Sequence, residues 1–144
     1  MNDINILFSL QGRLNRLRYF LYTIGLMIFQ AIATAVLAPV AVGGSGAGGL
    51  VPMLAIVAIE LVVAWCWIAL MVKRLHDLGH SGWYVLGLVA ILALLTFIFR
   101  DPRVSYLLFV VVGILSFAPG TKGTNRFGPD PLSKDPAPGA AAEN

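Results

Sequence analysis

The stretch "VKRLHDLGHSGWYV", Val72 to Val85, places two cations, an aspartate and two histidines between two long apolar runs. Only 12% of the 144 residues are charged, so this concentration of charge requires an explanation. Apolar runs on both sides predict membrane-spanning helices, and polar residues are then expected where the chain leaves the bilayer and turns back. The stretch therefore predicts a short connection at a membrane surface.

The overall composition is that of a membrane protein. Hydrophobic residues make up 58% of the chain, against about 45–50% in soluble domains, and the mean hydropathy is +0.84. The net charge of +3 comes from basic residues that flank apolar runs, which argues against nucleic-acid binding. The single cysteine, Cys66, lies inside an apolar run and no metal-ligand spacing is present, so we expect no metal, cofactor or catalytic residue.

Four apolar runs approach the length of about 20 residues that crosses a hydrocarbon core about 30 Å thick. They cover residues 19–42, 50–72, 83–99 and 104–118. Pro102, in the "RDPR" turn, prevents the last two runs from forming one helix. We expect an all-α, polytopic membrane protein with one four-helix domain over residues 1–132. The Gly- and Pro-rich tail, residues 133–144, is predicted to be disordered.

The segment before the first run is also patterned. Its apolar residues fall at helical spacing with arginines between them, which predicts a short helix lying in the membrane interface, broken at Gly12.

The basic residues give the expected orientation. With four spans, the termini and the Val72–Val85 stretch share one side, while Arg100 and Arg103 lie on the other. The positive-inside rule then places both termini in the cytoplasm. The first side holds eight of the ten basic residues: Arg13, Arg16, Arg18, Lys73, Arg74, Lys122, Arg126 and Lys134.

Three polar stretches carry a resemblance to a known family. They are "GRLNRLRYF" (12–20), "KRLHDLGHSGWY" (73–84) and "PGTKGTNRFGPDP" (119–131). Together and in order they resemble the small bacterial inner-membrane proteins grouped as domain of unknown function 805, the YhaH-like proteins, over roughly residues 5–132. Many members have two arginines where this chain has Lys73–Arg74, and a tyrosine where it has Phe127. The resemblance implies a four-helix inner-membrane protein and supplies no activity or ligand.

These stretches are expected to converge on the cytoplasmic face. Gly79 is suited to end a helix in a left-handed conformation, and Ser81 to cap the next one. In one interpretation, Arg–Asp pairs and turn caps form a structural network. In the other, guanidinium groups remain free for an anion, such as a lipid phosphate or an acidic partner, and arginine suits both. The candidate residues are Arg13, Arg16, Arg74, His76, Asp77, Ser81, Trp83, Asn125 and Asp130.

A second candidate position is Glu60, about midway along the second apolar run. A carboxylate at that depth costs several kcal/mol, so it is expected to face a cavity or a partner. One interpretation is a neutral carboxyl group hydrogen-bonded to Gln30, Thr34 or Thr96 on other helices. The other is a proton- or cation-linked step in transport.

Three classes of function follow. The sequence favours a scaffold or regulatory subunit that binds membrane lipids, another membrane protein or a second copy through its cytoplasmic face. The alternative is a small oligomeric transporter or channel that uses Glu60. A lipid-phosphate enzyme based on His76 and Asp77 is least favoured, because adjacent helical side chains diverge by about 100°.

Overall fold

The computed structural model describes residues 3–44 and 46–133, and every regular element in them is helical. The predicted all-α class is therefore confirmed. Of the predicted disordered tail, only Ser133 lies within the described residues. The elements are α1 (Asp3–Phe8), α2 (Arg16–Gly43), α3 (Ala47–Asp77), α4 (Trp83–Phe99), the 3-10 helix η1 (Pro102–Tyr106) and α5 (Leu107–Phe117).

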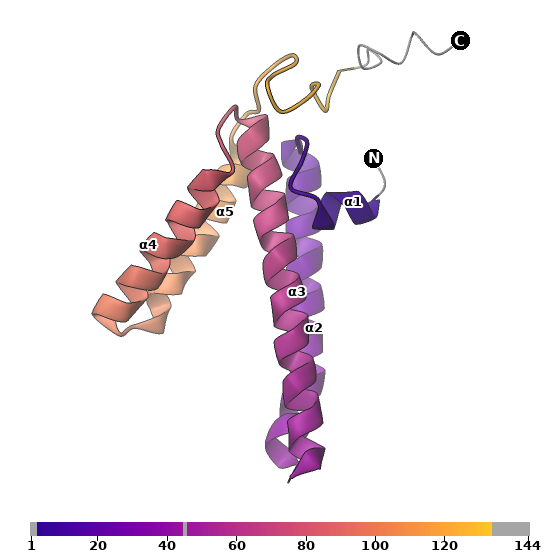
Figure 1. Ribbon diagram of the computed structural model, residues 1–144, viewed down its shortest axis with the longest axis vertical. Helices are drawn as coiled ribbons and strands as arrows, with labels where there is room; N and C mark the ends of the chain where they lie inside the picture. Colours follow the sequence, from indigo (N-terminus) through magenta and orange to yellow (C-terminus); the bar gives the residue numbers. More distant parts are fainter. Residues whose placement is uncertain (1–2, 45, 134–144) are drawn as a thin grey trace.

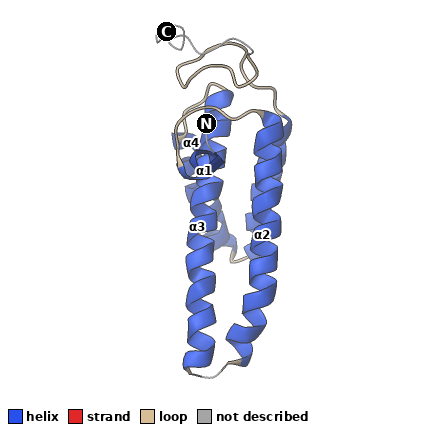
Figure 2. Ribbon diagram, turned by 90° about the vertical axis from the view of Figure 1, so that its right-hand side faces the viewer, coloured by secondary structure: helices blue, strands red, loops and turns tan. Residues whose placement is uncertain are grey.

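Helices α2 and α3 form a long antiparallel hairpin (Figures 1 and 2). They contain 28 and 31 residues, which at about 1.5 Å per residue gives lengths of about 42 and 46 Å. Both are long and apolar enough to cross a membrane. α3 continues past Val72 to Asp77, so its last turn carries the charged residues of the opening stretch.

The connection between α2 and α3 is short and rich in glycine. α2 ends at Gly43 and α3 begins at Ala47. A Cβ atom on Gly44 would lie 2.6 Å from the carbonyl carbon of Gly48, and one on Gly49 would lie 2.7 Å from the carbonyl oxygen of Gly44. Glycine is therefore needed here for a close approach of two backbone segments.

Helices α4 and α5 form a second, shorter hairpin that diverges from α3 (Figure 1). α4 has the bounds of the third apolar run. Its C-cap residue, Arg100, has a left-handed conformation, with φ 51°. The run 104–118 is not one α-helix, because η1 occupies Pro102–Tyr106 and α5 begins at Leu107. Pro102 provides the reason, since the fixed φ of proline favours the first position of a new helix.

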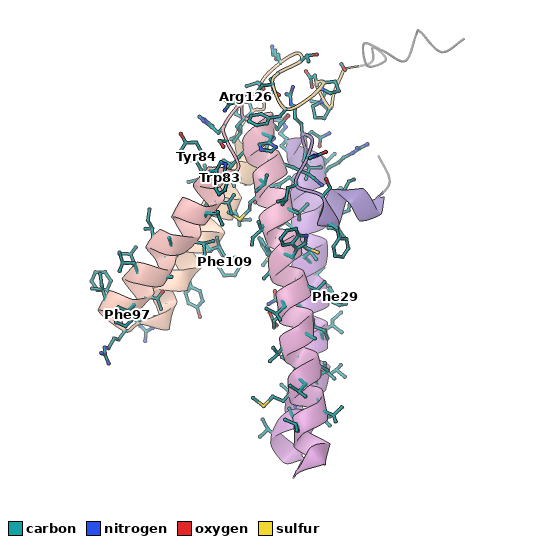
Figure 3. All side chains as sticks on the ribbon, in the orientation of Figure 1. Phe29, Trp83, Tyr84, Phe97, Phe109 and Arg126 are labelled. Carbon is teal, nitrogen blue, oxygen red and sulfur yellow. The ribbon has the colours of Figure 1, made fainter. Side chains whose placement is uncertain are left out.

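The buried core lies where the two hairpins and α1 meet. It includes Ile6, Leu14, Leu70, Val85 and Leu115. Elsewhere large apolar side chains face outward along the helices, as Phe29 and Phe97 illustrate (Figure 3). An apolar exterior of this extent suits a lipid environment, because soluble proteins rarely expose such continuous apolar surface.

Helix α1 points away from the long hairpin, transverse to its axis, in the upper part of Figure 1. Its position in the membrane interface stays a prediction. Lys73 Nζ donates to the Ile6 carbonyl at 2.6 Å, and Trp65 Nε1 donates to the Phe8 carbonyl at 3.0 Å. Both carbonyls belong to the last turn, where a helix leaves its acceptors unsatisfied. Side chains of α3 therefore hold the end of α1, which stops before Gly12.

Candidate functional site

The three polar stretches converge at one end of the molecule (Figure 1). We call this region, formed by residues 11–16, 73–82 and 118–132, the charged end. It contains the buried charged side chains of the described residues: three cations, Arg13, Lys73 and Arg74, and one carboxylate, Asp77. The bonds that these groups make bear on the two interpretations drawn from the sequence.

The end of α3 has the geometry that Gly79 predicted. Gly79 has φ 80°, and its N–H donates to the His76 carbonyl at 3.1 Å. The His80 N–H donates to the Leu75 carbonyl at 2.8 Å. This pair of bonds is a Schellman motif, in which glycine satisfies the last carbonyls of a helix. The motif turns the chain away from α3 two residues after Asp77, which is the last residue of the helix.

Asp77 is bound by two arginines, one at each carboxylate oxygen. Arg13 Nε donates to Oδ1 at 3.1 Å, and Arg74 Nη1 donates to Oδ2. All three side chains are almost fully buried. We call these three residues the Arg–Asp cluster. Because Arg13 precedes α2 and Asp77 ends α3, the cluster joins the charged ends of the long hairpin.

Arg74 also satisfies the end of α5. Its guanidinium donates to the carbonyl oxygens of Leu115, at 2.8 Å, and Ala118. A third bond, at 3.3 Å, reaches the Leu14 carbonyl ahead of α2. The last carbonyls of a helix have no intrahelical donor, so Arg74 acts as a side-chain cap for α5.

Arg13 holds the loop that follows α5. Its guanidinium donates to the carbonyls of Thr121 and Gly123, each at 2.5 Å, and to that of Gly128 at 3.4 Å. The Thr121 N–H returns a bond to the Asp77 carbonyl at 2.8 Å. Arg13 and Arg74 therefore donate their hydrogen bonds to acceptors within the protein, as the structural-network interpretation requires.

His76 and Asn125 extend the same network. His76 Nδ1 lies 3.2 Å from the Gly12 carbonyl, and its ring stacks on Phe127 with centroids 3.9 Å apart. Asn125 Nδ2 donates to the His76 carbonyl at 2.9 Å. His76 thus contacts different groups from Asp77, and the two do not form an acid–base pair.

Ser81 and Trp83 play smaller parts than the sequence indicated. The N-cap of α4 is Gly82, without a side-chain cap, so the prediction that Ser81 is the cap is wrong. Ser81 lies one residue too early, and its Oγ is 3.4 Å from the Trp83 N–H, a long contact. Trp83 is 77% exposed and lies beside Tyr84 on the outer surface (Figure 3), as boundary aromatics do.

Asp130 shapes the loop after α5. Its carboxylate accepts the N–H groups of Leu132 and Gly123, each at 2.9 Å. These two hydrogen bonds hold the pKa of the Asp130 carboxyl below its usual range, and the bond from Leu132 has the larger effect. The carboxylate oxygens thus organise the turn, and Asp130 borders a small pocket.

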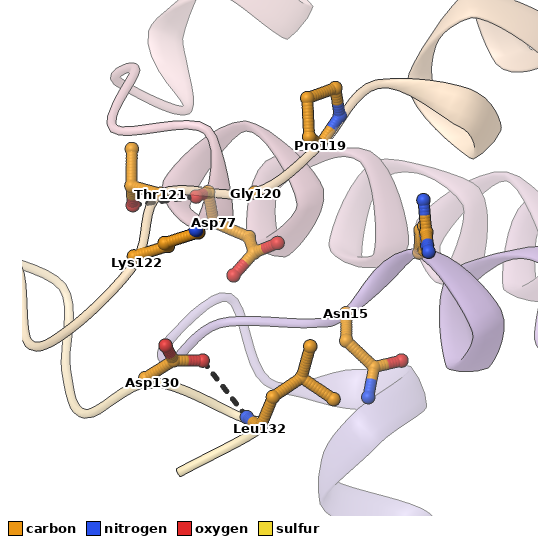
Figure 4. Close-up of a pocket in the computed structure, with 9 residues that line it drawn as sticks. Asn15, Asp77, Pro119, Gly120, Thr121, Lys122, Asp130 and Leu132 are labelled. Atoms are coloured by element: carbon orange, nitrogen blue, oxygen red, sulfur yellow. Dashed lines mark hydrogen bonds between the residues drawn. The ribbon is translucent and has the colours of Figure 1, made fainter.

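The pocket has a volume of about 240 Å³ and lies between the start of α2 and the loop after α5 (Figure 4). Arg16 and Lys122 line it, and within the described residues neither makes a hydrogen bond or an ion pair. Lys122 was not among the candidates from the sequence, although "GTKG" places it in the third polar stretch. The lining residues are Asn15, Arg16, Asp77, Pro119, Gly120, Thr121, Lys122, Asp130 and Leu132.

Gly120 offers a test of this packing. A Cβ atom at Gly120 would lie 2.1 Å from Asp77 Oδ2. The Asp77 carboxylate cannot easily move away, because an arginine binds each of its oxygens. Gly120→Ala is therefore expected to lower the free energy of unfolding in detergent by about 1–3 kcal/mol. Gly113→Ala in α5, with nothing within 4 Å of its Cβ, is the control and should stabilise by about 0.5–1 kcal/mol. Equal melting shifts would contradict the close approach at Gly120.

Glu60 lies in the long hairpin, away from the charged end. Gln30 Nε2 donates to Glu60 Oε2 at 2.6 Å, so one of the three partners expected from the sequence is in place. Thr96 instead donates to the Leu92 carbonyl of its own helix at 2.8 Å. The Gln30–Glu60 bond links α2 to α3.

The all-helical fold of the described residues, their apolar exterior and two helices long enough to cross a membrane are the features of a polytopic integral membrane protein. Residues 7–129 match the family described as "Protein of unknown function (DUF805)", and the chain belongs to this family. It is 31% identical over 121 residues to "Inner membrane protein YhaH" of Escherichia coli (strain K12), covering 84% of this chain and 85% of the relative. The protein of the same name in Escherichia coli O157:H7 gives the same values. No solved structure matches the chain significantly.

Proposed function

We propose that this chain is an inner-membrane scaffold or regulatory subunit that binds the phosphate of anionic lipids at its charged end. In this proposal the chain crosses the membrane four times and both termini lie in the cytoplasm. The relatives named as inner-membrane proteins support the location. The excess of basic residues at the charged end supports the orientation.

The observation that carries the proposal is the pair Arg16 and Lys122 at the small pocket. Both cations border a volume of about 240 Å³ and are not bonded within the described residues. Cations that are not used internally remain available to a phosphate, for which the arginine fork and the lysine ammonium are both suited.

The local electrostatics favour an anion. Two carboxylates, Asp77 and Asp130, also line the pocket, but both oxygens of Asp77 accept from arginines and Asp130 accepts two backbone N–H groups. The pocket also lies at the start of α2, where the helix dipole adds partial positive charge. The excess of positive charge should attract the negatively charged inner leaflet.

The test compares two double variants with the same change in charge. Arg16→Gln with Lys122→Gln alters the pocket, whereas Arg100→Gln with Arg103→Gln removes two cations at the opposite end of the α4–α5 hairpin. At about 1 kcal/mol per cation near an anionic surface, the first variant should bind phosphatidylglycerol about 30-fold more weakly. Binding is measured by native mass spectrometry of protein titrated with this lipid.

The matched variant should retain the lipid like the wild type. An equal loss in both variants would indicate general charge attraction, and no loss in the first would overturn the lipid proposal. Reporter fusions after Arg103 and after Leu132 check the orientation, because the proposal places these two positions on opposite sides of the membrane.

A further inference from the structure

A large groove opens between the two hairpins, on the side where α4 and α5 diverge from the long helices. Its volume is about 940 Å³, within the range of about 300–1,000 Å³ typical of small-molecule sites. Residues of α2, α3, α4 and α5 all contribute to it. The groove is separate from the pocket at the charged end.

The walls of the groove are apolar and include aromatic groups. Trp67 of α3 and Phe109 of α5 supply the rings, and Met27 and Met71 supply polarisable thioethers. Such walls suit a bulky apolar ligand, and aromatic faces attract cations in particular. The groove therefore resembles neither a polar channel nor a site for a hydrophilic solute.

One ionisable side chain lines the groove. Gln30 and Thr34 of α2, Glu60 of α3 and the indole N–H of Trp67 are the hydrogen-bonding groups, while α4 contributes Val85 and Val89 and α5 contributes Leu108 and Phe109. No basic side chain is among the described residues that line it. A ligand complementary in charge must supply the positive group that the groove lacks.

The bond to Gln30 leaves part of the carboxyl group available. Gln30 donates to Oε2 of Glu60 and thereby fixes the side chain's orientation. Oε1 makes no hydrogen bond with the described residues. An apolar groove thus contains an oriented carboxyl group with one oxygen unoccupied.

We propose that the groove binds an organic cation, a molecule with a bulky apolar body and a single delocalised positive charge placed against Oε1 of Glu60. The site requires binding only, so it is independent of lipid binding at the charged end and of any transport.

Other occupants fit these observations less well. A lipid acyl chain carries no group to meet the free oxygen of Glu60. In the described residues, the basic side chains of a second copy lie at its charged end, at Arg18 in the first turn of α2, or at Arg100 and Arg103 between α4 and α5. Neither satisfies an acid at mid-helix depth.

The experiment uses two probes of the same shape and opposite charge. Tetraphenylphosphonium and tetraphenylborate are titrated into the full chain in detergent, with binding measured by equilibrium dialysis. We expect the cation to bind and the anion to bind at least about tenfold more weakly, equivalent to about 1.4 kcal/mol.

Glu60→Gln keeps the shape of the side chain and removes the charge. It should lower cation affinity about tenfold, equivalent to about 1.4 kcal/mol. Ala31→Phe and Ala64→Phe provide a second route, because both alanines line the groove and are exposed, so a larger side chain fills it without removing a core contact. Either variant should weaken binding even if Glu60→Gln fails to fold.

Some outcomes would overturn the proposal. Equal binding of both probes, or unchanged binding in the folded Glu60→Gln protein, would show simple adsorption to apolar surface. A co-purified lipid or a second copy that the cation does not displace would assign the groove to that occupant instead. Loss of anionic-lipid binding in the Arg16 and Lys122 variant would leave this result unaffected, so the two proposals fail separately.

Discussion

Asp77→Asn is expected to lower the free energy of unfolding by about 3–5 kcal/mol, because it leaves two buried guanidinium groups without their counter-charge. Arg13 and Arg74 each donate to a different oxygen of this carboxylate, and all three side chains are almost fully buried. Asparagine has nearly the same size as aspartate, so the lost free energy of unfolding comes from the removed charge and not from a cavity. Reversible unfolding in mixed micelles is the measurement.

The chain offers a matched control in Asp101→Asn. Asp101 Oδ1 lies 3.8 Å from Arg103 Nε, but the side chains of Asp101 and Arg103 are 47% and 83% exposed. Exposed pairs contribute about 0–1 kcal/mol, so this variant should unfold almost like the wild type. If both variants lose the same small amount, the buried Arg–Asp cluster does not hold the charged end together.

Arg74→Lys is expected to detach the end of α5 even though the positive charge remains. The Arg74 guanidinium reaches Leu115, Ala118 and Asp77 with separate nitrogen atoms. A lysine ammonium is a single point of contact and cannot satisfy all of these acceptors together. Each buried carbonyl left without a donor costs about 1–3 kcal/mol, so the total loss should rival that of Asp77→Asn.

Limited trypsin digestion gives a local measure of this detachment. The loop after α5 carries the exposed residues Lys122 and Arg126, which lie close to carbonyls held by the Arg–Asp cluster. Cleavage there should become faster in Arg74→Lys. Arg18→Lys, at an exposed position on α2, should leave the rate unchanged. Equal cleavage rates in the wild type and in Arg74→Lys would show that α5 does not depend on this cap.

The helices could largely be predicted from the sequence because long apolar runs leave few alternatives in lipid. α4 coincides with its run, and Gly79 ends α3 as glycine should. The 3-10 segment η1 was harder to predict from the sequence. Pro102 forbids a continuous helix but does not show where the next α-helix begins. The divergence of the two hairpins depends on packing between distant residues, for which the sequence carries no local pattern.

The candidate site was predictable in its location and less so in its bonds. Charge bias brought Arg13, Arg74 and Asp77 to one end, and the structure joins them. The partners that decide their role are mostly backbone carbonyls, such as those of Leu115 and Thr121. A carbonyl is present at every residue, so sequence cannot indicate which one an arginine will reach. Lys122 was not a site candidate for a related reason, because only the folded loop places it at the same pocket as Arg16.

The bonds of the Arg–Asp cluster also impose an order on biosynthesis. Arg13, Arg74 and Asp77 lie within residues 13–77, but carbonyls of residues 115–128, which are translated later, complete their coordination. The cluster therefore cannot close until residue 128 has been translated. Until then the two guanidinium groups lack these carbonyl acceptors, so the loop after α5 completes the cluster last.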